Sequence, residues 1–170
     1  LFRDKGCASC HQFNDTSALF TDGQFHNTGT GYRRAGRAIR PLSVQLAPGV
    51  FVVPTVDTET ETFTDDGRFE VTGREADKWR YRTPSLRNVA LTGPYMHDGS
   101  IATLEGVVAF YAEGGGGDPA QDPRTRSVQL TESDQEALVA FLRTLTSKHV
   151  DALVSDARSV TIGERTAGGQ

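Results

Sequence analysis

The stretch GCASCH, residues 6–11, decides the fold because it holds the chain's only two cysteines, Cys7 and Cys10, followed at once by His11. The spacing Cys-x-x-Cys-His is the signature of covalent haem attachment. Each thiol can add across one haem vinyl group, and the adjacent imidazole can then reach the iron through one ring nitrogen. The sequence therefore predicts one covalently bound haem c with His11 as the proximal iron ligand.

Two other uses of a cysteine pair fit this stretch less well. A thioredoxin-like redox pair lies in a βαβ pattern and leaves His11 without a role, whereas glycine-rich, helix-poor sequence follows this pair. A zinc site needs about four ligands, and no second pair of cysteines or histidines stands at ligand spacing. The remaining histidines are scattered singly along the chain, at His26, His97 and His149.

Composition limits the partners and the compartment. The 170 residues suffice for one domain with a substantial core, and the formal net charge is −4 before any haem propionates are counted. This charge argues against nucleic acid as a partner and suits a basic redox protein. No apolar run approaches the ~20 residues that span a bilayer, so no membrane span is expected. Covalent haem attachment occurs outside the bacterial cytoplasm, which predicts a periplasmic location.

The chain carries no signal peptide and does not begin with Met, so we expect a mature, cleaved or truncated sequence. Residues 1–5 are typical of the last turn of a helix closed by Gly6. Residues 12–49 are rich in glycine and other turn formers and predict loops. After residue 147 the chain turns polar, which predicts a surface tail over residues 148–170.

Hydrophobic periodicity predicts two longer helices. Thr131 and Asp134 resemble a capping box at the start of the first, over residues 131–146. Thr103 is expected to cap the second, which runs through Tyr111 and ends at the glycines of residues 114–117. The apolar face of the first helix is formed by leucine and phenylalanine side chains, at Leu138, Phe141, Leu142 and Leu145.

Shorter elements are expected between residues 49 and 91. The β-branched and aromatic segments VFVVPTV (50–56) and RFEVTG (68–73) predict a short β-ribbon insertion, with the acidic residues 57–67 as a solvated loop. Residues 85–91 could form a short helix that begins near Pro84. The fold class predicted from these patterns is mainly α, with long loops and a short β-ribbon.

The order of five sequence blocks resembles a known family. After GCASCH come FHNTG (25–29), RTPSLRNVALTGPYMHDGS (82–100), TLEGVVAFY (103–111) and VAFLRTLT (139–146). This order resembles the C-terminal haem domain of the bacterial dihaem cytochrome c peroxidase and MauG-type enzymes. The resemblance implies a cytochrome c-like haem domain over residues 1–147 that partners an N-terminal haem domain. The HNTG block suggests no specific role.

The second iron ligand has two candidates. Met96 is the only methionine, and methionine opposite histidine is a common way to raise a haem potential. In the family that the chain resembles, however, the sixth ligand comes from the helix after the PYMHDG loop, which implies Tyr111. A phenolate is a hard anionic donor that favours Fe(III), so Tyr111 would suit the storage of oxidising equivalents. The plainer interpretation of Tyr111 is a core aromatic residue.

The resemblance also implies a calcium ion between the two haem domains. Thr92 and Pro94 stand where the family uses main-chain carbonyls, and waters plus an asparagine of the other domain would complete the shell. His97 resembles a family histidine near the haem, although a hydrogen-bonded loop histidine explains it equally well.

Three further residues have open interpretations. Arg82 and Arg87 can pair with haem propionates, because guanidinium forks bind carboxylates well, or they are ordinary surface arginines. Trp79, the only tryptophan, is either a site for electron-hole transfer or a core aromatic residue.

Two functions follow from these observations. The first is the electron-transfer haem domain of a dihaem peroxidase or MauG-like oxidase, with hydrogen peroxide reacting at the other haem and electrons exchanged with a small redox protein or a protein substrate. The alternative is a stand-alone monohaem electron carrier with His/Met ligation, which the single attachment motif favours.

Overall fold

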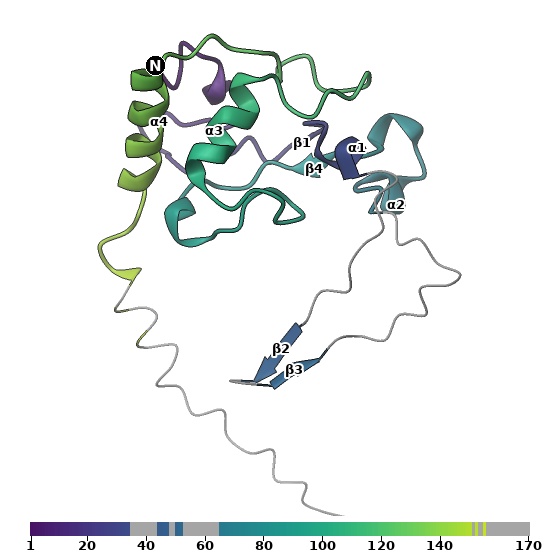
Figure 1. Ribbon diagram of the computed structural model, residues 1–170, viewed down its shortest axis with the longest axis horizontal. Helices are drawn as coiled ribbons and strands as arrows, with labels where there is room; N and C mark the ends of the chain where they lie inside the picture. The colour runs from purple at the N-terminus through teal and green to yellow at the C-terminus, as the bar shows by residue number, and fades with distance from the viewer. Residues whose placement is uncertain (35–43, 48–49, 53–64, 151, 153–154, 156–170) are drawn as a thin grey trace, which may run out of the picture.

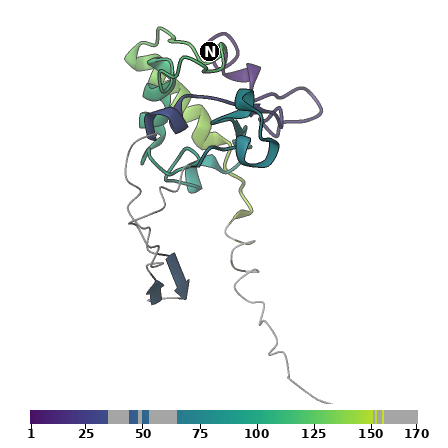
Figure 2. The same cartoon turned by 90° about the vertical axis from the view of Figure 1, so that its right-hand side faces the viewer.

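Two helices, α3 (Leu104–Ala112) and α4 (Glu132–Thr144), pack side by side and form the helical part of the fold. The computed structural model describes residues 1–34, 44–47, 50–52, 65–150, 152 and 155. Figure 1 shows the two helices at the left of the view, with long loops and short elements around them, and Figure 2 shows the same arrangement turned by 90°.

Both helices begin where the sequence predicts. The Thr103 side chain accepts a hydrogen bond from the Gly106 backbone N–H at 3.1 Å. Thr131 and Asp134 form a reciprocal capping box, each side chain accepting from the other's backbone N–H at 3.1 Å. These bonds satisfy N–H groups that have no partner within the helix. The helix α3 ends as predicted, because Gly114 adopts a left-handed φ of 95° that few other residues tolerate.

The core joins the first residues of the chain to α4. The Phe2 ring lies 5.0 Å from that of Phe141 on α4 and 6.3 Å from that of Phe20, which is 4% exposed. The Lys5 ammonium group donates to the Gln129 carbonyl at 2.7 Å, 124 residues away. The attachment segment is thereby fixed against the far end of the chain, with the helices beside it. The buried apolar side chains of this core are Phe20, Leu86, Leu104, Val108, Leu138, Val139, Leu142 and Leu145.

The remaining elements are short. Strands β1 (Phe25–His26) and β4 (Tyr81–Arg82) pair antiparallel, with Phe25 opposite Arg82, and so bring the segment after the haem motif against the RTPSLRN block. Strands β2 (Val44–Ala47) and β3 (Val50–Val52) form a second antiparallel pair. The other short elements are helices α1 (Thr30–Arg34) and α2 (Phe69–Thr72) and the 3-10 helices Cys7–Ser9, Glu75–Asp77 and Val89–Leu91.

Several expectations for short segments are corrected by the structure. The ribbon exists, but its strands are β2 and β3, whereas the RFEVTG segment forms α2. Local polar contacts override the β propensity there, because Asp77 accepts from the Thr72 hydroxyl at 2.9 Å and Gly73 closes the turn at φ 63°. Residues 85–91 are helical only over Val89–Leu91, and residues 1–5 form a turn.

Two other expectations lie mostly outside the described residues. The acidic loop predicted over residues 57–67 is described only from Asp65 onward. The tail predicted from residue 148 is described only over residues 148–150, 152 and 155.

Candidate haem-binding site

A cavity of about 440 Å³ lies between the attachment segment, α3, α4 and the loop of residues 81–97. Its size falls within the range of about 300–1,000 Å³ typical of small-molecule and cofactor sites. Cys7, Cys10 and His11 all line it. Much of the remaining wall is aliphatic, from Leu86, Val89, Leu104, Val107, Val108, Leu138 and Leu142. An apolar cavity beside two thiols and an imidazole suits a porphyrin, whose flat ring is itself apolar.

The attachment segment presents both thiols to this cavity. Gly6 adopts a φ of 86°, which starts the 3-10 helix Cys7–Ser9, and the His11 backbone N–H donates to the Cys7 carbonyl at 3.0 Å. Both cysteines are free and half-buried. Burial raises the pKa of each thiol, so both stay protonated near neutral pH. Neither sulfur is in a disulfide, so both thiols are available to add across a haem vinyl group.

His11 is oriented for metal binding by its second nitrogen. Its Nδ1 lies 2.9 Å from the Phe20 carbonyl oxygen, to which it donates when the proton is on that nitrogen, leaving Nε2 unprotonated. Such a bond fixes the tautomer and the ring orientation of a metal-binding histidine. Burial lowers the pKa of His11, which favours the neutral form that a metal needs. The residues present fit a haem held by two thioethers and one imidazole.

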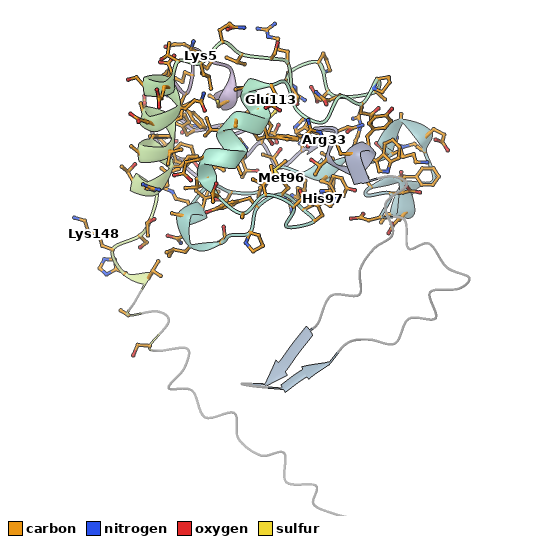
Figure 3. The ribbon with its side chains drawn as sticks, viewed as in Figure 1. Lys5, Arg33, Met96, His97, Glu113 and Lys148 are labelled. Carbon is orange, nitrogen blue, oxygen red and sulfur yellow. The ribbon has the colours of Figure 1, made fainter. Side chains whose placement is uncertain are left out.

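Both candidates for the second iron ligand lie in the cavity wall. Tyr111 is in the last turn of α3, where burial raises its pKa to about 12. No hydrogen bond to its hydroxyl group is found within the described part of the chain, so the phenol oxygen is available to bind a metal. Met96 adopts a left-handed φ of 69° on the loop that passes below α3 in Figure 3. The geometry brings both residues to the cavity and does not choose between them.

The two arginines proposed for the propionates lie differently. Arg82, on β4, lines the cavity. Arg87 is not among the described residues that line it; its Nε donates to the Ala18 carbonyl at 2.7 Å and its guanidinium lies 5.3 Å from the Phe20 ring centre. Trp79 is likewise outside the cavity wall and packs edge-on against Tyr32 at 5.7 Å.

The residues proposed for calcium and the loop histidine lie along the cavity margin. Thr92 and Pro94 line the cavity, and the Thr92 hydroxyl donates to the Val89 carbonyl at 3.0 Å. The His97 ring stacks on that of Tyr81 at 3.5 Å, and its Nε2 lies 3.4 Å from an Asp65 carboxylate oxygen. His97 is therefore an ordered part of the cavity wall.

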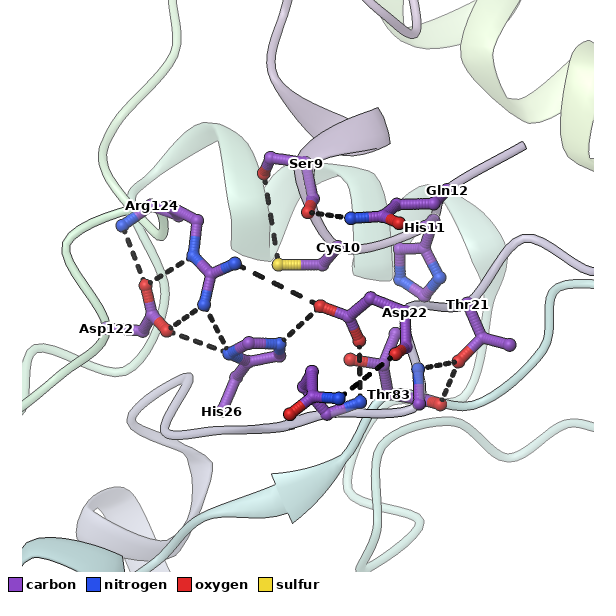
Figure 4. A network of polar contacts seen from close by, with 12 residues as sticks. Ser9, Cys10, His11, Gln12, Thr21, Asp22, His26, Thr83, Asp122 and Arg124 are labelled. Carbon is purple, nitrogen blue, oxygen red and sulfur yellow. Dashed lines mark hydrogen bonds and ion pairs between the residues drawn. The ribbon is translucent and has the colours of Figure 1, made fainter. Parts of the chain in front are cut away.

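A buried polar cluster beside Cys10 was missed by sequence reasoning. The two ring nitrogens of His26 each lie 2.8 Å from a carboxylate oxygen, one of Asp22 and one of Asp122 (Figure 4). The guanidinium of Arg124 binds Asp122 at 2.8 Å and lies 4.0 Å from Asp22. The Arg124 guanidinium offsets the cost of burying the two carboxylates, and His26 and Arg124 are the members of this cluster that line the cavity. The FHNTG motif, which contains His26, was the sequence feature that could have indicated this cluster. The acidic partners of His26, Asp22 and Asp122, belong to no recognisable motif.

The sulfur of Cys10 lies close enough to Asp22 and His26 for their ligand atoms to fall within 4.8 Å of one another. We assign no ion to this group, because Cys10 belongs to the haem motif and both nitrogens of His26 already meet carboxylates. Elsewhere in the described ranges no comparable group of histidine, cysteine and acidic residues is found.

Stability in acid is expected to depend on Asp122. Its hydrogen bonds from Arg124 hold the pKa of the carboxyl group well below its usual range. A depressed pKa contributes stability above the unfolded-state value of about 3.9 and loses it as the pH falls toward the folded-state value. We expect Asp122→Asn to cost about 1–3 kcal/mol at pH 7 and to weaken the fall in stability below about pH 4. Thermal unfolding measured across this pH range checks both effects.

The matched control for this prediction is Asp15→Asn, which changes an exposed carboxylate. It should leave both the stability at neutral pH and the shape of the pH profile unchanged. If Asp122→Asn shows the same acid limb as the wild type, the ion pair does not contribute in the way described.

Comparison with known proteins agrees with this site. The Cytochrome c family matches residues 1–146. Cytochrome-c peroxidase IdrP1 of Denitromonas iodatirespirans is 38% identical over 152 residues, covering 85% of this chain and 38% of that protein. Methylamine utilization protein MauG of Methylorubrum extorquens is 34% identical over 146 residues, covering 85% of this chain and 32% of that protein.

A solved structure shows the same likeness. The crystal structure of a MauG-like protein associated with microbial copper homeostasis superimposes with a TM-score of 0.59 at 31% identity, covering 87% of this chain and 45% of that one. With the family match, this likeness confirms the predicted fold class, a cytochrome c-like domain with a short β-ribbon.

The chain belongs to the cytochrome c family, and the covalent haem c that this family carries fits the cavity. The resemblance to cytochrome c peroxidases and MauG is also confirmed, so the chain is a relative of haem peroxidases, which are oxidoreductases. The chain spans between 37% and 40% of the length of three peroxidase relatives. None of the helices in the described residues is long and apolar enough to cross a membrane.

Proposed function

We propose that this chain is the electron-transfer haem domain of a periplasmic dihaem peroxidase or MauG-like oxidase that uses hydrogen peroxide. The observation that carries the proposal is the cavity that has Cys7, Cys10 and His11 in its wall together with Tyr111. The similarity to peroxidases and MauG over most of the chain supports the choice of reaction.

The residues of the chain have distinct roles in this proposal. Cys7 and Cys10 would hold the porphyrin, and His11 and Tyr111 would both ligate its iron. An iron ligated by both residues would not take up peroxide, so peroxide would react in the N-terminal haem domain. The bound haem supplies one-electron chemistry, and the apolar wall keeps water from the ring. An anionic phenolate stabilises the ferric state and so suits a domain that shares the oxidised state of the enzyme.

Three further contacts complete the proposal. Arg82 is the arginine whose place in the cavity wall suits a propionate. Thr92 and Pro94 contribute main-chain carbonyls to a calcium ion at the boundary with the other haem domain, whose own oxygens complete the shell. Electrons come from a small redox protein or a protein substrate, and the net charge of −4 favours a basic partner.

The number of haems in the native protein tests the dihaem arrangement. Haem content from the pyridine haemochrome assay is divided by the molar amount of native, unfragmented protein determined by mass. Two haems for each molecule are expected. A single haem would favour the alternative, a stand-alone monohaem electron carrier with Met96 as the second ligand.

Replacing Tyr111 tests the ligand assignment. In the ferric protein, Tyr111→Phe removes the phenol oxygen while keeping the ring, so the iron should become five-coordinate or water-bound. Met96→Leu should leave the spectrum unchanged, and the wild type should lack the methionine-to-iron charge-transfer band near the red edge of the spectrum. Absorption and electron paramagnetic resonance spectra distinguish these states. The opposite pattern, a change with Met96→Leu and none with Tyr111→Phe, would establish Met96 as the ligand.

A further inference from the structure

We propose that the HNTG segment is a positioning device for Tyr111, acting through a clasp between two loops. The clasp consists of Asn27, Thr28 and Gly29 on one side and Gly116, Asp118 and Asp122 on the other. It fastens the chain just after α3 to the segment that follows the haem attachment motif. This inference rests on the proposed function, because it concerns Tyr111 as an iron ligand.

Tyr111 is close to the end of α3, which backbone hydrogen bonds close and which runs directly into a glycine-rich loop. It is the penultimate residue of α3, and the Gly114 backbone N–H donates to the Tyr111 carbonyl at 3.1 Å. The next residues are Gly115, Gly116 and Gly117, which offer no side chains to fix the helix end. A run of glycines loses the most conformational freedom on ordering, so something outside α3 must hold it.

Asn27 supplies the central contacts of the clasp. Its side chain is 3% exposed; its Nδ2 donates to an Asp118 carboxylate oxygen at 2.6 Å, and its Oδ1 accepts from the Gly29 backbone N–H at 2.8 Å. The Asn27 carbonyl also accepts from the Asp122 backbone N–H at 2.8 Å. One buried residue thus fixes its own turn and two points of the opposite loop.

Backbone contact brings the two loops closer than side chains would allow. The Gly116 backbone N–H donates to the Thr28 carbonyl at 2.9 Å. A Cβ atom on Gly29 would lie 2.5 Å from the Gly116 Cα, and one on Gly116 would overlap the Gly29 carbonyl group. Outside this contact, Arg33 reaches the Gly116 carbonyl at 3.4 Å and Glu113 at 3.9 Å; Figure 3 shows this pair at the end of α3.

The clasp connects the two segments of the chain that carry the expected iron ligands, His11 and Tyr111. The segment on its first side also contains Phe20, whose carbonyl orients His11, and His26, which lies beside Cys10. The segment on its second side begins at Gly116, five residues after Tyr111. Fixing one segment to the other therefore sets where the phenol group lies relative to the imidazole, and loosening the clasp should let Tyr111 move away from the iron.

The test compares ferric holoprotein variants of the full chain by the phenolate-to-iron charge-transfer band and by electron paramagnetic resonance. Asn27→Ala removes the clasp's central side chain and should cause loss of the phenolate signature. The double variant Asn27→Asp with Asp118→Asn reverses donor and acceptor across the 2.6 Å bond at the same net charge, and should restore it. Asp118→Asn alone is a milder change, available if Asn27→Ala does not fold, and should cause partial loss.

Thr131→Ala is the matched control, because it removes a side-chain hydrogen bond at the start of α4, away from the clasp. It should lower the unfolding temperature while keeping the phenolate signature. The inference is overturned if folded Asn27→Ala or Asp118→Asn keeps the wild-type spectrum, or if Thr131→Ala loses the signature equally. A wild type without any phenolate signature would instead overturn the Tyr111 ligation itself, so the two failures are distinguishable.

Discussion

Replacing both Cys7 and Cys10 with alanine is expected to leave a chain that retains no haem through acid extraction and does not fold stably. The cavity of about 440 Å³ would then lack the haem that is expected to fill it. At about 24 cal/mol for each Å³, an empty cavity of this size costs up to about 10 kcal/mol, an upper bound because water can enter. That cost is comparable with the whole stability of a typical domain, about 5–15 kcal/mol.

Haem staining after denaturing electrophoresis and circular dichroism of the same samples check this prediction. The single variant Cys7→Ala should keep one thioether and hence stained protein. Ser9→Ala is the control within the same turn, since it removes a 2.7 Å hydrogen bond to the Gly6 carbonyl and leaves both thiols. Haem that stays bound to the double variant through extraction would contradict covalent attachment at these positions.

Gly116→Ala is expected to destabilise the folded protein by at least about 3 kcal/mol, at the upper end of what one added methyl group costs. The new Cβ would overlap the Gly29 carbonyl group, and both partners are backbone, so no side chain can rotate away. The two loops would have to separate, which would also break the hydrogen bond to the Thr28 carbonyl. Urea unfolding of the holoprotein measures the loss.

The neighbouring substitution Gly117→Ala is the matched control. A Cβ there meets nothing within 4 Å, so the cost comes only from its left-handed φ of 78°. That strain amounts to about 1–2 kcal/mol. Equal losses for the two variants would mean that backbone conformation, and not the contact between the loops, explains the intolerance at Gly116.

Much of the helical framework and the attachment site could be predicted from sequence, because their signals are local. A threonine side chain that can accept from the backbone N–H three residues later marks the start of a helix. Thr103 and Thr131 do so at the starts of α3 and α4, as the sequence predicts. The spacing of Cys7, Cys10 and His11 also needs no tertiary information, and the structure places all three in one cavity wall.

The polar wall of the site could not be predicted, because its members come together only through the fold. His26 lies 96 residues from Asp122, and Asn27 lies 91 residues from Asp118. Neither Asp118 nor Asp122 belongs to a motif. From the sequence alone, each has the features of an ordinary acidic residue in a loop. The prediction for the α2 segment failed for a different, local reason: its β-branched residues favour a strand, but Asp77, five residues on, holds the Thr72 hydroxyl in a helical turn.

The pairing of Phe2 with Phe141 has a consequence for the order of folding. Cys7 and Cys10 lie in the same segment as Phe2, and the packing around them is complete only when a partner more than a hundred residues later along the chain has been brought into contact. Contacts of such high sequence separation form slowly, since a long stretch of chain must be brought into a loop before any of them is gained. The attachment segment therefore stays accessible to the haem-ligating machinery for as long as the chain is unfolded, and later folding encloses the cofactor.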